Sequence, residues 1–194
     1  MNTIRLKAPL SKEAIQGLRC GDSVLLSGTV YTARDAAHAR LCAALEKGED
    51  LPVDLRKQTV FYAGPTPPPP GKPTGSIGPT TSMRMDAYTP ALLRYGMNGM
   101  IGKGERSEAV KESVRETGSV YFAATGGCAA YMAACVTACE VVAYEDLGTE
   151  SIKRLTVENL PLTVAVDALG NDFYALGVAQ YRNGMEVERE KNKT

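Results

Sequence analysis

The sequence has no net charge, no long apolar run and few metal-binding side chains. Its 22 lysines and arginines balance 22 aspartates and glutamates, which argues against nucleic-acid binding by bulk phosphate attraction. No segment reaches the roughly 18 consecutive apolar residues that a membrane-spanning helix needs. His38 is the only histidine, and the five cysteines form no CxxC motif. We therefore expect no nucleic-acid partner, no membrane partner and no metal bound by this chain alone.

The N-terminus also lacks the apolar core of a secretory signal peptide, so we expect a cytoplasmic protein with reduced thiols. The sequon at residues 192–194 then has no meaning as a glycosylation site. The 194 residues, 44% of them hydrophobic, suit one compact domain, which buries roughly 70% of the surface of its unfolded chain. We place this domain at residues 1–180 and a charged C-terminal tail at residues 181–194.

Apolar periodicity and capping residues predict an alternation of strands and helices, which is typical of an α/β protein. The expected strands span residues 3–6, 23–32, 60–63, 99–102, 119–123, 141–144 and 162–167. The expected helices span residues 12–18 with Ser11 as N-cap, 34–47, 85–95 with an interruption at Pro90, 107–116 before Gly118, and a buried helix at 127–136. A helical turn is expected from Thr149, and residues 182–194 are expected to fray.

A proline-rich segment, residues 64–82, interrupts this pattern, with six of the eleven prolines between residues 65 and 73. Such a run favours polyproline II and cannot pair inside a sheet. Two interpretations stay open. The segment is a linker or surface arm, or it is a stiff loop that crosses the domain and presents the residues after it.

Neither of two common phosphate-binding loops is present. Met97 stands where a Walker loop ending at Gly102-Lys103 needs its first glycine, and Ser107 stands where the dinucleotide fingerprint needs its third. Both kinds of nucleotide site are therefore excluded.

Polar residues at the ends of expected elements suggest a different anion site. The stretch of residues 78–84 places hydroxyl groups where a helix is expected to begin, and a helix N-terminus binds anions. If the helix starts at once, Thr80 and Arg84 share one face. The alternative is a Ser/Thr N-cap followed by a surface arginine.

Two further cations follow expected strands. Arg34 precedes Asp35 directly after the strand of residues 23–32, and Lys103 lies between two glycines after the strand of residues 99–102. An Arg–Asp helix start and a glycine turn are the alternatives. Together with Arg84 they could bind a small dianion. The residues alone indicate an anion-binding α/β domain and no more.

Five stretches carry a family resemblance: GTVYTARDAAHAR (28–40), GPTTSMRMD (78–86), GKGERS (102–107), TGGCAAY (125–131) and residues 138–172. They resemble the β subunit of class I fumarases and L-tartrate dehydratases, which is similar to the C-terminal domain of the single-chain members. The likeness covers residues 5–177 and implies a swivelling β/β/α domain. Two residues depart from the family pattern: Ala33 stands where the family often has glycine, and Cys128 stands where it often has alanine. Both replacements are small residues.

The resemblance also implies a function and its partners. The family reversibly hydrates a C4 dicarboxylate at a site between two subunits, with a [4Fe-4S] cluster held by cysteines of the α subunit and acting as Lewis acid. By motif, Arg34, Arg84 and Lys103 bind the substrate, and Thr80 is the base or only positions the substrate. An α2β2 assembly is implied.

Three functions stay open from the sequence. The first is the β subunit of a fumarate hydratase, which converts fumarate to L-malate. The second is the β subunit of an L-tartrate dehydratase, which converts tartrate to oxaloacetate. The third belongs to another class, a non-catalytic anion-binding or regulatory domain.

Overall fold

A computed structural model describes residues 3–191, with side chains through residue 182. Seven strands form one sheet in the order β1-β2-β3-β4-β5-β7-β6. The strands are β1 Thr3–Ala8, β2 Ser23–Thr32, β3 Thr59–Phe61, β4 Gly99–Gly102, β5 Val120–Ala123, β6 Val136–Ala143 and β7 Ile152–Val166. The α-helices are α1 Lys12–Gly17, α2 Asp35–Glu46, α3 Thr89–Tyr95, α4 Glu108–Thr117, α5 Ala129–Ala134 and α6 Phe173–Lys191, and the 3₁₀ turns are η1 Ser82–Met85 and η2 Glu145–Glu150.

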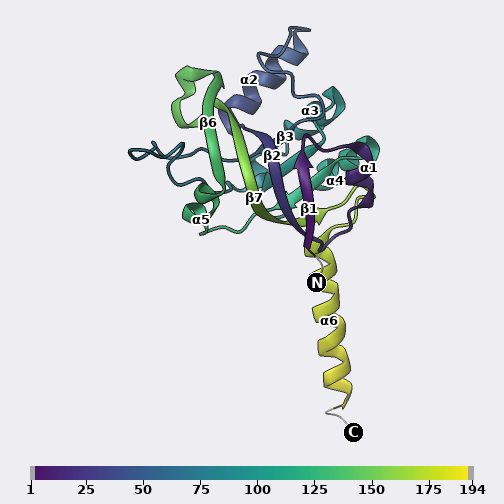
Figure 1. The fold of residues 1–194 in the computed structure, drawn as a ribbon. Helices are drawn as coiled ribbons and strands as arrows, with labels where there is room; N and C mark the ends of the chain where they lie inside the picture. The colour runs from purple at the N-terminus through teal and green to yellow at the C-terminus, as the bar shows by residue number, and fades with distance from the viewer. Residues whose placement is uncertain (1–2, 192–194) are drawn as a thin grey trace.

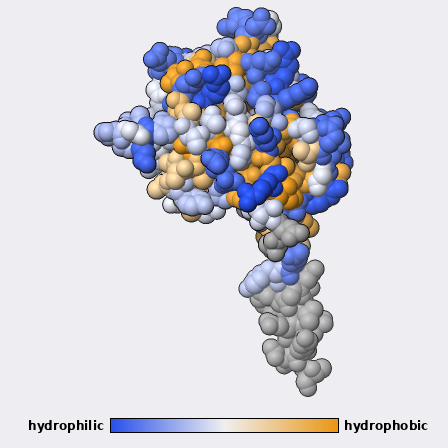
Figure 2. Space-filling view, viewed as in Figure 1, coloured by the Kyte–Doolittle hydropathy of each residue, from blue (hydrophilic) through white to orange (hydrophobic). Residues whose placement is uncertain are grey.

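The sheet closes on itself, because β2 pairs with β7 as well as with β3. Strands β2 to β5 run parallel to one another, and β7 runs antiparallel to both β2 and β5. These five strands form a ring, with β1 and β6 added outside it. Figure 1 shows β1, β2, β7 and β6 as the front layer. On this face, hydrophobic and hydrophilic residues are interspersed (Figure 2).

Two cores lie on the two faces of β3, β4 and β5, because successive side chains of a strand point in opposite directions. One core fills the ring and includes Phe61, Ile101, Phe122, Leu26 and Leu155. The other separates these strands from α2, α3 and α4, and it includes Val60, Met100, Tyr121, Leu41 and Leu92. Two strand layers and one helix layer confirm the predicted β/β/α domain.

Several sequence-based predictions are confirmed at the residue level. Strands β2 and β4 have the predicted bounds, and α2 and α4 match within one or two residues. The Ser11 hydroxyl caps α1 by accepting a hydrogen bond from the Ala14 amide at 3.1 Å. Gly118 ends α4 in the left-handed conformation, at φ 66°, which glycine adopts without strain.

The prediction for residues 149–167 was wrong in its first half. Helical turns are present over Glu145–Glu150 (η2), with a break at Gly148, but one strand of 15 residues, β7, follows and starts ten residues before the predicted strand at residue 162. Ile152, Leu155 and Val157 are buried on this strand. This strand pairs with β2, β5 and β6. These long-range hydrogen bonds fix residues 152–161 in a strand that the local sequence pattern did not predict.

The predicted buried helix at residues 127–136 is also wrong. Helix α5 spans Ala129–Ala134, and Met132 is its only buried residue. Tyr131 is 62% exposed. The helix lies at one end of the ring, where one side faces solvent, so small apolar residues did not mean burial all round.

Two further helix predictions need correction. The expected helix at residues 85–95 is split into η1 and α3, and Pro90 lies at the start of α3, where its missing N–H costs nothing. The tail expected to fray at residues 182–194 is helical through Lys191, within α6, and residues 192–194, which include the sequon, lie outside the described residues. Figure 1 shows this helix leading away from the ring. Within the described residues no helix is long and apolar enough to cross a membrane.

The proline-rich segment has properties of both interpretations. Its outer residues, 67–72, are exposed and project from the body as an arm (Figure 1). The arm is closed at its base, where Thr66 and Ser76 pair through a 3.0 Å backbone hydrogen bond and Gly75 donates to the Thr66 carbonyl at 3.2 Å. The segment also leads the chain from β3 to residues 79–82 at the edge of the sheet.

Candidate active site

The four candidate residues lie at the carboxyl ends of parallel strands. Arg34 follows β2 by two residues, and Lys103 follows β4 directly. Beyond the end of β3, the Tyr62 carbonyl accepts a hydrogen bond from the Thr80 amide at 2.7 Å. Parallel strands bring their carboxyl ends to one edge, where α/β proteins bind ligands.

Thr80 and Lys103 lie side by side on two extended segments. The Lys103 amide donates to the Thr80 carbonyl at 3.3 Å, and the Ser82 amide donates to the Lys103 carbonyl at 2.9 Å. Thr80 therefore precedes η1 and does not share a helical face with Arg84, so that prediction was wrong. Thr81 occupies the N-cap position but its side chain makes no capping bond within the described residues. Pairing with β4 replaced the expected helix start.

Arg34 and Arg84 meet at one carboxylate. The Arg84 Nε donates to Asp35 Oδ1 at 2.7 Å, and Arg34 Nη2 lies 3.7 Å from Asp35 Oδ2. The Arg84 side chain is 50% exposed. Two guanidinium groups from separate elements thus converge on one acidic side chain, which the sequence analysis treated only as part of a helix start.

Glu150 is a second acidic group that the sequence analysis missed. Its Oε1 lies 3.4 Å from Arg34 Nη2, and its Oε2 accepts a hydrogen bond from the Ala36 amide at 3.1 Å, at the start of α2. A carboxylate is favourable at a helix N-terminus. No local signal marks Glu150, because it reaches this place only through η2, more than a hundred residues along the chain.

Unpartnered polar atoms remain in the centre of this group. Arg34 Nε and Asp35 Oδ2 are buried and have no hydrogen-bond partner within residues 3–191. A buried N–H without a partner costs free energy, and such atoms in folded proteins usually bond to water or a ligand. Arg34 therefore keeps a buried N–H that no group of the described residues satisfies.

Two glycines allow the backbone to pass close to the side chains of Arg34 and Lys103. A Cβ on Gly64 would lie 3.3 Å from Arg34 Cδ, and the preceding residue, Ala63, pairs with Pro79 next to Thr80. A Cβ on Gly126, after β5, would lie 3.5 Å from Lys103 Cδ. The backbone thus approaches both cations closely.

His38 lies behind Arg34 and is fully buried. Its Nδ1 lies 2.9 Å from the Arg34 carbonyl, which can only accept, so Nδ1 carries the proton. Its ring meets Tyr62 edge-on at 5.2 Å between centroids. Burial lowers the pKa of His38 to about 4, partly offset by the bond to the Arg34 carbonyl. This histidine is a neutral core residue and not a metal ligand.

The cysteines do not fit an iron–sulfur cluster. Burial raises the pKa of the Cys20 and Cys42 thiols to about 11. All five cysteines are free thiols. In the part of the chain that the structure describes, no three histidine, cysteine or acidic side chains are grouped to hold a metal.

An apolar cavity of about 400 Å³ lies next to the site and does not include it. The proline-rich arm, β6, η2 and β7 line it, and the lining residues include Thr149 and Lys153. None of the four candidate residues lines this cavity. The candidate residues instead form part of the surface at the edge of the sheet.

Comparison with known proteins identifies the family of this chain. The family model described as "Fumarase C-terminus" matches residues 1–177. The chain belongs to the fumarase C-terminus family. It is 40% identical over 151 residues to the anaerobic class I fumarate hydratase of Escherichia coli, and 41% identical to the mitochondrial fumarate hydratase 1 of Leishmania major. These matches cover 77% of the chain.

Relatives of the fumarase C-terminus family differ in length. The chain spans 28% of the length of the two fumarate hydratases named above. It is also 37% identical to a Methanocaldococcus jannaschii protein assigned as the beta subunit of an L(+)-tartrate dehydratase. That match covers 85% of this chain and 88% of the relative. Membership confirms the predicted family.

Proposed function

We propose that this chain is the β subunit of an iron–sulfur-dependent hydro-lyase acting on a C4 dicarboxylate, with fumarate and L-malate as first candidates. One observation supports this most strongly. Arg34 and Arg84 converge on Asp35 at the sheet edge where Thr80 pairs with Lys103. Two guanidinium forks suit the two carboxylates of such a substrate.

In the proposed reaction, the three cations bind the substrate and Thr80 moves the proton. During dehydration, the Thr80 alkoxide takes a proton from the carbon next to a carboxylate and becomes the alcohol, the C–H electrons form the double bond, and the hydroxyl leaves with the C–O electrons. The leaving hydroxide then takes this proton, which regenerates the alkoxide. The released hydroxide and the proton on Thr80 make up the water lost. A threonine alcohol is a weak base, and the nearby cations Arg84 and Lys103 favour its charged form.

We propose that a separate α subunit completes the enzyme, in an α2β2 assembly. Since the cysteines of this chain do not fit a cluster, the [4Fe-4S] cluster belongs to that partner. When bound, it supplies Lewis-acid chemistry for the substrate hydroxyl. We further propose a cytoplasmic location, in keeping with the free thiols. The domain boundary at residue 180 stays a prediction.

A tartrate dehydratase is the second candidate, favoured by the length match to the assigned beta subunit. Tartrate differs from malate by one hydroxyl, and the same cations suit both substrates. A non-catalytic anion-binding domain remains the candidate from a different class.

The deciding experiment is an assay of the chain with and without an α partner. We expect the isolated chain to be colourless and inactive, and the reconstituted complex to turn over fumarate, malate or tartrate. The preferred substrate then chooses between the two hydro-lyases. Full activity of the isolated chain would contradict the proposal, and a complex inactive on all three substrates would favour the non-catalytic alternative.

A further inference from the structure

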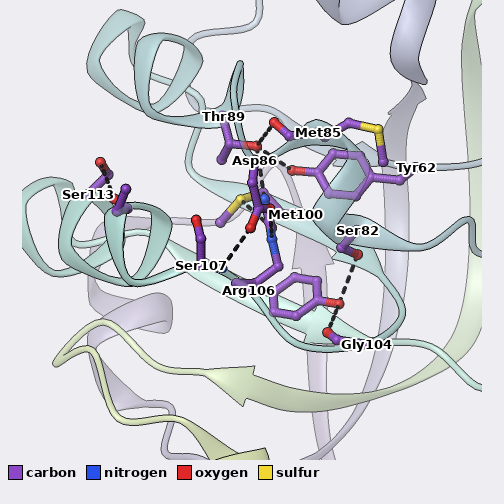
Figure 3. Close-up of polar contacts among 12 residues, drawn as sticks. Tyr62, Ser82, Met85, Asp86, Thr89, Met100, Gly104, Arg106, Ser107 and Ser113 are labelled. Carbon is purple, nitrogen blue, oxygen red and sulfur yellow. Dashed lines mark hydrogen bonds and ion pairs between the residues drawn. The ribbon is translucent and has the colours of Figure 1, made fainter.

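A buried arginine, which the proposed mechanism does not use, lies beneath the candidate site. The Arg106 side chain is 0% exposed. Its Nε donates to Asp86 Oδ1 at 2.7 Å, its Nη2 to Thr89 Oγ1 at 2.9 Å, and its Nη1 to Met100 Sδ at 3.5 Å. Figure 3 shows these contacts.

Arg106 fixes the loop after β4 to the segment after η1. Asp86 also accepts a hydrogen bond from the Ser107 amide at 2.6 Å. Asp86 lies two residues after Arg84, and Arg106 lies three residues after Lys103. The buried pair thus ties together the two segments that contain the proposed substrate-binding cations.

Two tyrosines cover the guanidinium of Arg106. Its Cζ lies 5.3 Å from the ring centre of Tyr62 and 4.9 Å from that of Tyr121. Both rings are fully buried. Their hydroxyl groups differ: the Tyr62 hydroxyl lies 3.4 Å from Thr89 Oγ1, away from the candidate residues.

The Tyr121 hydroxyl bridges the two site segments. The Tyr121 hydroxyl donates its single proton to the Gly104 carbonyl, at 2.8 Å. The Ser82 hydroxyl, 2.9 Å away, must therefore donate to it. These are the dashed lines that end at Ser82 and Gly104 in Figure 3. Burial raises the pKa of Tyr121 above its usual range, so its hydroxyl carries a proton to donate at neutral pH.

The neighbouring backbone leaves space for this bridge. A Cβ on Gly102 would lie 1.9 Å from Ser82 Oγ, so only glycine permits Ser82 to approach at this point. Ser82 was expected from sequence to cap a helix. Its side chain instead reaches inward to Tyr121.

We infer that Tyr121 is a positioning residue, which sets the spacing between Thr80 and Lys103 through its bridge from Ser82 to Gly104. This inference rests on the proposed function for its effect on turnover. Its effect on the backbone does not depend on that function. Ser82 follows Thr80 by two residues, and Gly104 is the residue after Lys103, so a shift of either end moves a candidate side chain.

The test compares Tyr121→Phe with Tyr62→Phe in the complex with the α subunit. Both substitutions delete one buried hydroxyl and keep the ring on Arg106. For Tyr121→Phe we expect KM for the dicarboxylate to rise about tenfold, the range of one or two neutral hydrogen bonds. For Tyr62→Phe we expect KM to stay within about twofold of wild type, well inside the span of one such bond. Loss of folded protein alone would lower turnover without changing KM.

A second measurement uses amide hydrogen exchange in the isolated chain. The Ser82 and Lys103 amides pair across the two segments, so their exchange reports the spacing directly. We expect exchange to be faster at these amides in Tyr121→Phe and unchanged in Tyr62→Phe. Ser82→Ala should match Tyr121→Phe, and the double variant should add little.

The outcomes separate the two proposals. Unchanged exchange at Ser82 and Lys103, or an active Tyr121→Phe complex with the KM of wild type, overturns the positioning role. A wild-type complex that turns over none of the three substrates overturns the proposed function. The exchange result then still decides whether Tyr121 sets the spacing of the two segments.

Discussion

Two arginine–aspartate pairs in this molecule share one geometry and differ in their surroundings. In each, Nε lies 2.7 Å from Oδ1, for Arg84 with Asp35 and for Arg106 with Asp86. The first pair is 50% and 28% exposed, and the second is 0% and 10% exposed. An exposed ion pair contributes little to the stability of the fold, whereas the loss of one partner of a buried pair leaves an uncompensated charge and destabilises the fold strongly. The exposed pair belongs to the surface proposed to bind the substrate, and the buried pair stabilises the segments that form this surface.

The largest effect on turnover should come from Thr80, which lies at the candidate site. Thr80→Val keeps the shape and removes the hydroxyl, so turnover should fall by about 10²–10⁴-fold, the range for a lost general base. Substrate affinity should change much less, since the cations remain. Kinetics of the complex would check this, and Thr80→Ser should retain measurable activity. Turnover within about threefold of wild type would assign the proton to another group.

The buried pair should dominate stability. Arg106→Ala leaves Asp86 buried without its partner, so the free energy of unfolding should fall by about 3–5 kcal/mol. Arg84→Ala is the matched control at the exposed pair and should lower it by less than about 1 kcal/mol. Denaturant unfolding of both variants measures the contrast. Equal losses would mean that exposure does not distinguish the two pairs.

The three cations of the candidate site should instead affect turnover more than stability. Removal of Arg34, Arg84 or Lys103 should cost about 1.5–3 kcal/mol of kcat/KM, as expected for a charged hydrogen bond. Arg84→Lys should not restore it, because the planar fork is lost. Arg34→Ala should also lower the melting temperature, because Glu150 and Asp35 lose a partly buried partner. Wild-type kinetics in Arg84→Ala would remove Arg84 from the site.

The smallest expected effect at neutral pH concerns His38, which contacts the Arg34 carbonyl and the Tyr62 ring. Its pKa is lowered to about 4 in the folded chain from an ordinary 6.5, so the unfolded chain binds the proton more tightly. Stability from the neutral ring is therefore complete above about pH 6.5 and falls by up to about 1.4 kcal/mol per unit as pH drops towards 4. Unfolding of His38→Gln as a function of pH should show a flatter slope in this window. An unchanged slope would assign the pH dependence to other groups.

Much of the scaffold could be predicted from local sequence. Strand β2, with its β-branched residues, and helix α4, with an apolar face and Gly118 at its end, have patterns that act over a few residues. Strand β7 could not be predicted in full, because its first half is fixed by hydrogen bonds to β2 and β6. Helix α5 is composed like a buried helix, and its position at the end of the ring exposes it.

For the candidate site, local patterns predicted that Arg34 and Lys103 follow strands. The hydroxyl-rich stretch of residues 78–84 indicated Thr80 and Arg84, and the motifs that resemble the family then added a role for each residue. The contacts of these side chains, in contrast, depend on the tertiary structure. The closed ring brings Glu150 to Arg34 and Tyr121 beneath Ser82, because pairing between distant strands, and not the spacing of residues along the chain, sets those distances.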